Sequence, residues 1–126
     1  MKLRIHGNSL RLRVARSEVE RLMRAGRIEE AICFGSAEDA KLIYALECVA
    51  GQKQISVRWR PQEVTVMLPP EEARAWSEGD AVGLYANCNV GGTKLAIQVE
   101  KDFACLDGSD ADTKDRFANP KQGTAC

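Results

Sequence analysis

The chain has 126 residues, of which 44% are hydrophobic and 29% are charged, a balance typical of one globular domain. Its 18 basic and 18 acidic residues cancel to a formal net charge of zero, which argues against a protein that coats nucleic acid or membrane without selectivity. No run reaches the ~20 apolar residues of a membrane span, and the charged start of the chain does not resemble a signal peptide. The five cysteines include no Cys-x-x-Cys pair, so we expect free thiols in a cytoplasmic protein without a membrane partner.

The first half of the chain has the pattern of four strands and one helix. Alternating apolar runs on either side of Gly7-Asn8 predict a β-hairpin with one buried face. Ser17 and Glu20 have the spacing of a capping box, which predicts the start of a helix, and Gly26 can end this helix. Two further apolar runs predict strands over residues 28–34 and 42–46.

The second half repeats this order of elements. Pro61-Gln62 interrupts an alternating apolar pattern and predicts a second hairpin. Pro69-Pro70, followed by two glutamates, is typical of a helix start, and Gly79 can end that helix. Gly91-Gly92 predicts the turn between the last two strands. The strands predicted in this half cover residues 55–59, 64–68, 82–85 and 95–99.

The two halves correspond at a nearly constant spacing. The run from Leu10 to Val14 falls on residues 64–68, which lie 54 positions later, and Gly26 falls on Gly79, 53 positions later. A half of about 50 residues is too small to bury its own apolar strand faces, so the halves are expected to pack on each other. We predict a mainly β fold with two short helices (α+β), in which duplicated β-β-α-β-β units form a pseudo-two-fold split β-barrel. A chance similarity between two α+β halves is the alternative. The predicted repeats cover about 2–49 and 54–101.

Residues 1–106 are expected to form this single duplicated domain. Nine apolar residues share the buried phase of their predicted elements and are expected in its core. These are Leu12, Leu22, Ile32, Leu46, Val57, Val66, Trp76, Leu84 and Ile97. From residue 107 onward Gly, Ser, Asp, Asn and Pro are frequent, so residues 107–126 are predicted to form a mobile acidic tail.

The run from Lys2 to Val14 (KLRIHGNSLRLRV) resembles the opening of MazE- and AbrB-type domains, which have a strand, a Gly-Asn-Ser turn and a second strand. Those domains continue with a Pro-led helix and a Glu-Gly-Asp turn. Here the two pieces stand in the second half, at Leu68-Pro69 and Glu78-Gly79-Asp80. The first half has Ala15 at the Pro position, and the second half has Arg60-Pro61-Gln62 in place of the turn motif. Each half therefore resembles a differently eroded copy of one ancestor.

This resemblance implies an architecture. MazE- and AbrB-type chains form homodimers that interlock into a split β-barrel, and this chain is similar to such a dimer fused into one polypeptide. A pseudo-dimeric monomer and a homodimer of fused chains both stay open. The span from residue 1 to residue 106 also resembles a small bacterial family of unknown function, and that resemblance implies no activity.

The sequence lacks the signatures of catalysis and of metal binding. His6 is the only histidine, which leaves no His-based zinc site and no Ser-His-acid triad. The run from Gly91 to Lys94 does not have the order of a phosphate-binding loop and fits a hairpin turn. A calcium loop counted from Asp110 would need glycine at position 115, where this chain has Asp115. We expect no catalytic residue, no metal site and no cofactor, and therefore a binding or regulatory module rather than an enzyme.

The distribution of charge suggests one partner. Residues 1–27 hold eight bases against two acids, and residues 100–115 hold six acids against two bases. The first predicted hairpin places basic side chains on one face, and β-ribbons of this kind enter the DNA major groove. The resemblance implies further contacts from the Gly-Asn-Ser turn. The predicted DNA-binding residues are Lys2, Arg4, Asn8, Arg11 and Arg13.

Two alternatives to DNA binding stay open. The bases can be the solvated faces of ordinary strands, and the second half has lost the turn motif. A protein-interaction module is the other alternative, since antitoxins of the MazE type clamp a toxin with their tail. Here the tail has Phe117 as its only aromatic residue. A neighbouring gene for a small ribonuclease-like toxin would favour this alternative.

Overall fold

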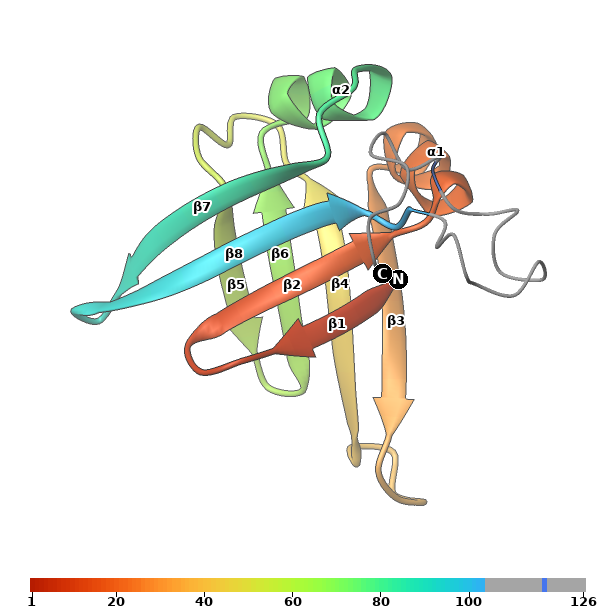
Figure 1. Cartoon of the computed structure of the whole chain (residues 1–126). Helices are drawn as coiled ribbons and strands as arrows, with labels where there is room; N and C mark the ends of the chain where they lie inside the picture. The colour runs from red at the N-terminus through yellow and green to blue at the C-terminus, as the bar shows by residue number, and fades with distance from the viewer. Residues whose placement is uncertain (104–116, 118–126) are drawn as a thin grey trace.

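The computed structural model describes residues 1–103 and residue 117. This part of the chain folds into eight strands and two helices (Figure 1). The strands are β1 (Lys2–Ile5), β2 (Ser9–Val14), β3 (Arg27–Cys33), β4 (Lys41–Cys48), β5 (Ser56–Arg60), β6 (Glu63–Leu68), β7 (Gly83–Val90) and β8 (Thr93–Lys101). The helices are α1 (Arg16–Ala25) and α2 (Pro70–Glu78). The predicted mainly β fold with two short helices is confirmed.

The strands form two four-stranded sheets that cross face to face (Figure 1). Sheet A has the order β1-β2-β8-β7, and sheet B has the order β3-β4-β6-β5. Each sheet therefore takes one hairpin from each half of the chain. The pairs within a hairpin are antiparallel, whereas the central pairs β2–β8 and β4–β6, which join the halves, are parallel. The two halves are interlocked rather than stacked side by side.

Exchange of the two halves converts the strand order of one sheet into that of the other. The central registers agree as well, because Ser9 lies opposite Ala96 in sheet A and Glu63 lies opposite Ile43 in sheet B. The duplication and its pseudo-two-fold axis stay predictions. The expected split barrel is not observed among the described residues. Their strand pairing ends at β1 and β7 in one sheet and at β3 and β5 in the other, which leaves two open sheets.

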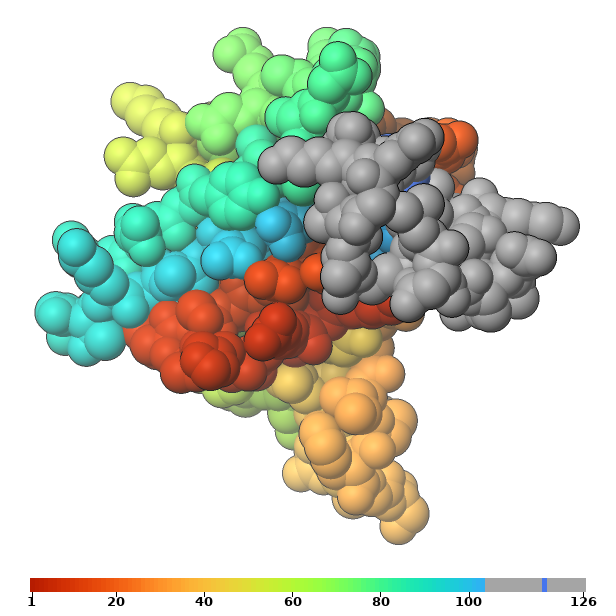
Figure 2. Space-filling model, viewed as in Figure 1, coloured from red at the N-terminus to blue at the C-terminus, as the bar shows by residue number. Residues whose placement is uncertain are grey.

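The core lies between the sheets and is closed at one end by the helices. Six of the nine predicted core residues are buried: Leu12, Leu22, Leu46, Val66, Trp76 and Ile97. Val57 and Leu84 are half-buried against this cluster. The prediction for Ile32 was wrong, since its side chain is 47% exposed. Ile32 pairs with Leu42 where β3 and β4 project beyond β1 (Figures 1 and 2), so sheet A does not cover it.

The helix boundaries follow local hydrogen bonding. The predicted capping box of Ser17 and Glu20 was wrong, because α1 begins at Arg16 and the backbone N–H of Ala15 donates to Glu18 Oε1 at 2.9 Å. A carboxylate at the third helical position thus satisfies the start of the helix. Gly26 ends α1 in the left-handed conformation with φ of 85°, which only glycine adopts at low cost. Pro70 opens α2 as predicted.

Phe117 returns to the folded domain. Its backbone N–H donates to the carbonyl of Asp102 at 2.9 Å, and its ring packs edge-on against Phe103 at 6.0 Å between centroids. The guanidinium of Arg16 and the ammonium of Lys101 lie 5.6 and 5.2 Å from the ring centre, within cation–π range. Apart from Phe117, the predicted tail over residues 107–126 lies outside the described residues.

Candidate functional site

The first hairpin carries four basic side chains on the outer surface of sheet A. In the register of β1 and β2, Lys2 lies opposite Arg13 and Arg4 lies opposite Arg11. The residues between them, such as Leu3 and Leu12, point the other way and pack in the core, because side chains alternate along a strand. We call the surface formed by Lys2, Arg4, Arg11 and Arg13 the basic face. The structure thus brings together four of the five predicted DNA-binding residues.

The four cations differ in how far they are neutralised. Arg11 Nε lies 3.0 Å from Gln98 Oε1 and 3.2 Å from Glu100 Oε1. Lys2 Nζ lies 3.1 Å from Asp102 Oδ2, but the lysine side chain is 60% exposed, and such pairs contribute little to stability. Arg4 and Arg13 form no ion pair with any residue that the structure describes. Like charges directly across a strand pair are destabilising, so this surface is not optimised for folding.

The fifth predicted residue, Asn8, lies in the turn between β1 and β2 and forms two hydrogen bonds to β8. Its side-chain amide donates to the carbonyl of Lys94 at 2.6 Å, and its own carbonyl accepts the backbone N–H of Ala96 at 3.1 Å. Gly7, the preceding residue, has φ of 56° and allows the tight turn. Asn8 therefore fastens the turn between β1 and β2 to β8 with one of its two amide hydrogens.

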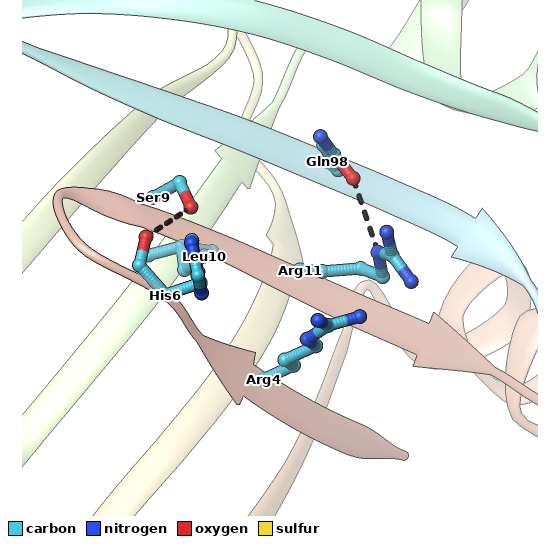
Figure 3. Close-up of a pocket in the computed structure, with 6 residues that line it drawn as sticks. All are labelled: Arg4, His6, Ser9, Leu10, Arg11 and Gln98. Carbon is cyan, nitrogen blue, oxygen red and sulfur yellow. Dashed lines mark hydrogen bonds between the residues drawn. The ribbon is translucent and has the colours of Figure 1, made fainter.

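Two shallow cavities open on the basic face. One has a volume of about 160 Å³, and Figure 3 shows its lining residues. They are Arg4, His6, Ser9, Leu10, Arg11 and Gln98. The neighbouring cavity, of about 280 Å³, is lined by Lys2, Leu3, Arg4, Arg11 and Arg13. Arg4 and Arg11 border both cavities, so the basic face is one continuous surface. Each cavity is several times the ~30 Å³ that a water molecule occupies and has room for a small anionic group.

The sheet register adds two residues that sequence reasoning missed. Gln98 of β8 lies beside Arg11, and Tyr85 of β7 lies beside Gln98. The Tyr85 hydroxyl donates to Glu100 Oε2 at 2.8 Å. Partial desolvation and this hydrogen bond raise the pKa of Tyr85 to about 12, so the phenol stays neutral at physiological pH. No local motif marks these residues, because their position depends on the pairing of β2 with β8.

The outer surface of sheet B has the opposite character. Arg27 Nη1 lies 2.7 Å from Glu47 Oε1, its Nη2 lies 3.2 Å from Glu63 Oε1, and its Nε lies 3.0 Å from Glu29 Oε1. Arg58 Nη2 approaches Glu47 and Glu63 at 3.5 and 3.6 Å. We call the surface formed by Arg27, Glu29, Glu47, Arg58 and Glu63 the ion-pair face. A hydrogen bond from Thr65 and the charge of Arg27 lower the pKa of Glu63. Each of these five charged side chains has a partner of opposite charge.

The described part of the chain also contains one histidine, three cysteines and many acidic side chains. No group of three or more His, Cys, Asp or Glu side chains there could hold a metal ion. Cys33, Cys48 and Cys88 are free thiols, and burial raises the pKa of Cys48. Cys105 and Cys126 lie outside the described residues. Neither of the two helices described is long and apolar enough to cross a membrane.

The chain was compared with known proteins. It matches a family described as a family of unknown function (DUF7009) over residues 1–121. No curated protein and no solved structure matches it. The resemblance to MazE and AbrB therefore stays a prediction, whereas the expected membership of an uncharacterised family is confirmed. The match covers nearly the whole sequence, and the chain belongs to this family of unknown function.

Proposed function

We propose that the chain is a binding module, not an enzyme, and that its basic face contacts the phosphates of nucleic acid. The observation that carries this proposal is the pairing of four cations across β1 and β2, two of which lack an ion pair with described residues. Phosphate contacts would offset the repulsion between the opposed cations and would release counterions from the nucleic acid. Lys2, Arg4, Arg11 and Arg13 are the contact residues.

The ion-pair face supports this assignment by contrast. On the sequence spacing of 54 residues, Lys2, Arg11 and Arg13 correspond to Ser56, Thr65 and Met67 of sheet B. Arg4 corresponds to Arg58, which has carboxylate partners there. The same position in the fold can thus carry an arginine with carboxylate partners, whereas Arg4 has no such partner among the described residues. Cations that face each other lower the stability of the fold, so their presence on the basic face favours a role in binding.

A fused, duplicated MazE/AbrB-type unit is the architecture that we propose for this module. The matching central registers of the two sheets support it. Only the first unit carries the basic face, so one chain presents one such surface. A palindromic DNA site would require a homodimer of fused chains, since two-fold sites are read by two equivalent surfaces. Asn8 anchors the turn through its bond to Lys94, and as a DNA contact it stays a prediction.

Fluorescence anisotropy with a labelled oligonucleotide over a series of salt concentrations tests the proposal. We expect affinity to fall steeply as salt rises. The double variant Arg4→Glu/Arg13→Glu should lose binding at low salt. Its matched control is Arg60→Glu/Arg74→Glu, which makes the same change in net charge at exposed positions on β5 and α2 and should bind as the unmodified chain does. Absence of binding at micromolar protein, or equal loss in both double variants, would contradict the proposal.

A protein-interaction module is the second candidate. Three large apolar side chains are exposed near the ends of three strands: Ile5 by 67%, Phe34 by 71% and Trp59 by 68%. Figure 1 shows β1, β3 and β5 ending on the lower side of the molecule. Exposed aromatic residues of this kind often serve as anchors in protein interfaces. Capture of one defined protein by the unmodified chain but not by Trp59→Asp, with little salt dependence, would favour this candidate over nucleic acid.

A further inference from the structure

The basic face continues into a polar and aromatic surface on the same side of sheet A. One row of side chains crosses all four strands, because Arg4 pairs with Arg11, Arg11 with Gln98, and Gln98 with Tyr85. Figure 2 views this side, where the visible parts of the first hairpin (red) and of β7–β8 (cyan to green) adjoin one another. Positive charge therefore occupies one half of the sheet. The other half holds the amide of Gln98, the exposed ring of Tyr85 and the carboxylate of Glu100, which contacts both Arg11 and Tyr85.

The dimensions and fastening of this surface do not suit the major groove of a duplex. Adjacent strands lie about 4.8 Å apart, so the outer strands of a four-stranded sheet are about 14 Å apart. The major groove is only ~12 Å wide and admits a two-stranded ribbon. The β1–β2 hairpin cannot enter alone, because Asn8 and the backbone of β2 bind it to β8. The bases of a duplex would thus stay out of reach of Tyr85.

Tyr85 and Gln98 can instead contact bases that are not stacked in a duplex. The Tyr85 side chain is 57% exposed, and its hydroxyl is held by Glu100, which fixes the ring. The Gln98 oxygen accepts from Arg11, and Figure 3 shows its amide nitrogen turned away from that bond. This nitrogen has no hydrogen-bond partner among the described residues. An exposed aromatic ring and an available amide nitrogen beside a row of basic side chains are the elements with which sheets bind single strands.

We propose that this side of sheet A binds single-stranded nucleic acid in preference to a duplex, with the backbone over the basic face and a base stacked on Tyr85. The inference rests on the proposed function, because it uses the same phosphate contacts. It differs from the ribbon-in-groove mode, in which base contacts come from the first hairpin. Arg11 links the two halves of the surface, since it borders both cavities and binds Gln98.

Three labelled probes of equal length test this proposal by anisotropy at one low salt concentration: oligothymidylate, an abasic strand and a DNA duplex. Oligothymidylate should bind most tightly. Tyr85→Ala should weaken oligothymidylate binding by about tenfold, the order expected for one lost stacking contact, and should leave the abasic strand unchanged. Tyr85→Phe removes only the bond to Glu100 and should bind within about twofold of the unmodified chain.

The outcomes separate the two proposals. Duplex binding as tight as oligothymidylate binding, or a Tyr85→Ala effect of equal size on the abasic strand, would overturn the single-strand preference and leave phosphate binding intact. Absence of binding to all three probes would overturn both. Circular dichroism of Tyr85→Ala checks that the variant is folded, and Tyr85→Phe shows whether loss of the Glu100 bond alone moves the result.

Discussion

The outer faces of the two sheets occupy corresponding places in the strand order, but they differ in whether their arginines have carboxylate partners. On the ion-pair face, Arg27 and Arg58 each contact two or more carboxylates. On the basic face, Arg4 and Arg13 have no such partner among the described residues, and Arg11 shares Glu100 with Tyr85. The ion pairs of the first of these faces therefore connect all four strands of sheet B. The basic face has arginines without a carboxylate partner among the described residues, and a surface that binds an anionic partner requires such charges.

The largest expected effect concerns the core that both faces share. Trp76 is 1% exposed and its indole N–H donates to the carbonyl of Val82 at 3.2 Å. Trp76→Ala should lower the free energy of unfolding by about 3–5 kcal/mol, as large aromatic truncations do. Urea denaturation followed by fluorescence of the remaining tryptophan, Trp59, measures this loss. A loss below about 1 kcal/mol would show that neither face depends on this packing.

Removal of an arginine should lower the free energy of unfolding more on the ion-pair face than on the basic face. Arg27→Ala would leave Glu47 and Glu63 without their central cation, and we expect a loss of about 1–2 kcal/mol, reduced from a fully buried case by partial exposure. Arg13→Ala should change the free energy of unfolding by less than about 0.5 kcal/mol or increase it, because Arg13 faces Lys2. Equal losses in the two variants, measured by the same denaturation, would remove the distinction between the faces.

Acid should weaken the ion-pair face. The pKa of Glu63 is lowered in the folded chain from its ordinary value of 4.5, so its contribution to stability is present above that pH and is lost as pH falls through the lowered pKa. The unmodified chain should therefore lose stability below about pH 4.5 more steeply than Arg27→Ala does. Thermal melts over a pH series measure the difference. Parallel curves for the two proteins would mean that the hydrogen bond from Thr65, and not the charge of Arg27, lowers the pKa of Glu63.

The smallest effect is spectroscopic. Glu100→Gln should lower the pKa of Tyr85 from about 12 toward its ordinary value of 10.0, because the carboxylate no longer disfavours the phenolate. The raised pKa contributes stability that is present below pH 10 and is lost as pH rises toward 12. An ultraviolet titration in a Tyr44→Phe background isolates Tyr85, since these are the two tyrosines of the chain. If the titration midpoint of Tyr85 does not change in Glu100→Gln, desolvation alone raises its pKa.

Local sequence patterns were sufficient to predict most of the elements but not how the hairpins join. Alternation and turn residues predicted the first hairpin, and Pro69-Pro70 predicted α2. The parallel pairing of β2 with β8 depends on residues more than 80 positions apart, and no local rule specifies it. For that reason the basic pairs were foreseen, whereas Tyr85 and Gln98 were not. The prediction that Ile32 is buried failed for a similar reason, because the burial of this residue depends on how far sheet A extends.

The turn between β1 and β2 shows a related limit of prediction from sequence. A family resemblance assigned Asn8 to DNA, but its amide binds the carbonyl of Lys94, a contact that exists only when β8 is in place. A side chain with both donor and acceptor groups fits either role from sequence alone. The four basic residues are less ambiguous, because cations with few carboxylate partners on a strand face have little to contribute to folding.

The most direct test of the contrast between the faces is the melting temperature with and without an oligonucleotide, measured for three proteins at low salt. A ligand that binds only the folded state raises the melting temperature. We predict an increase for the unmodified chain, an equal increase from a lower starting temperature for Arg27→Ala, and none for Arg4→Glu/Arg13→Glu, whose starting temperature is not reduced. A rise in the melting temperature of Arg4→Glu/Arg13→Glu on adding the oligonucleotide would contradict the account. So would the absence of a rise for Arg27→Ala, because binding is assigned to sheet A and stabilising ion pairs to sheet B.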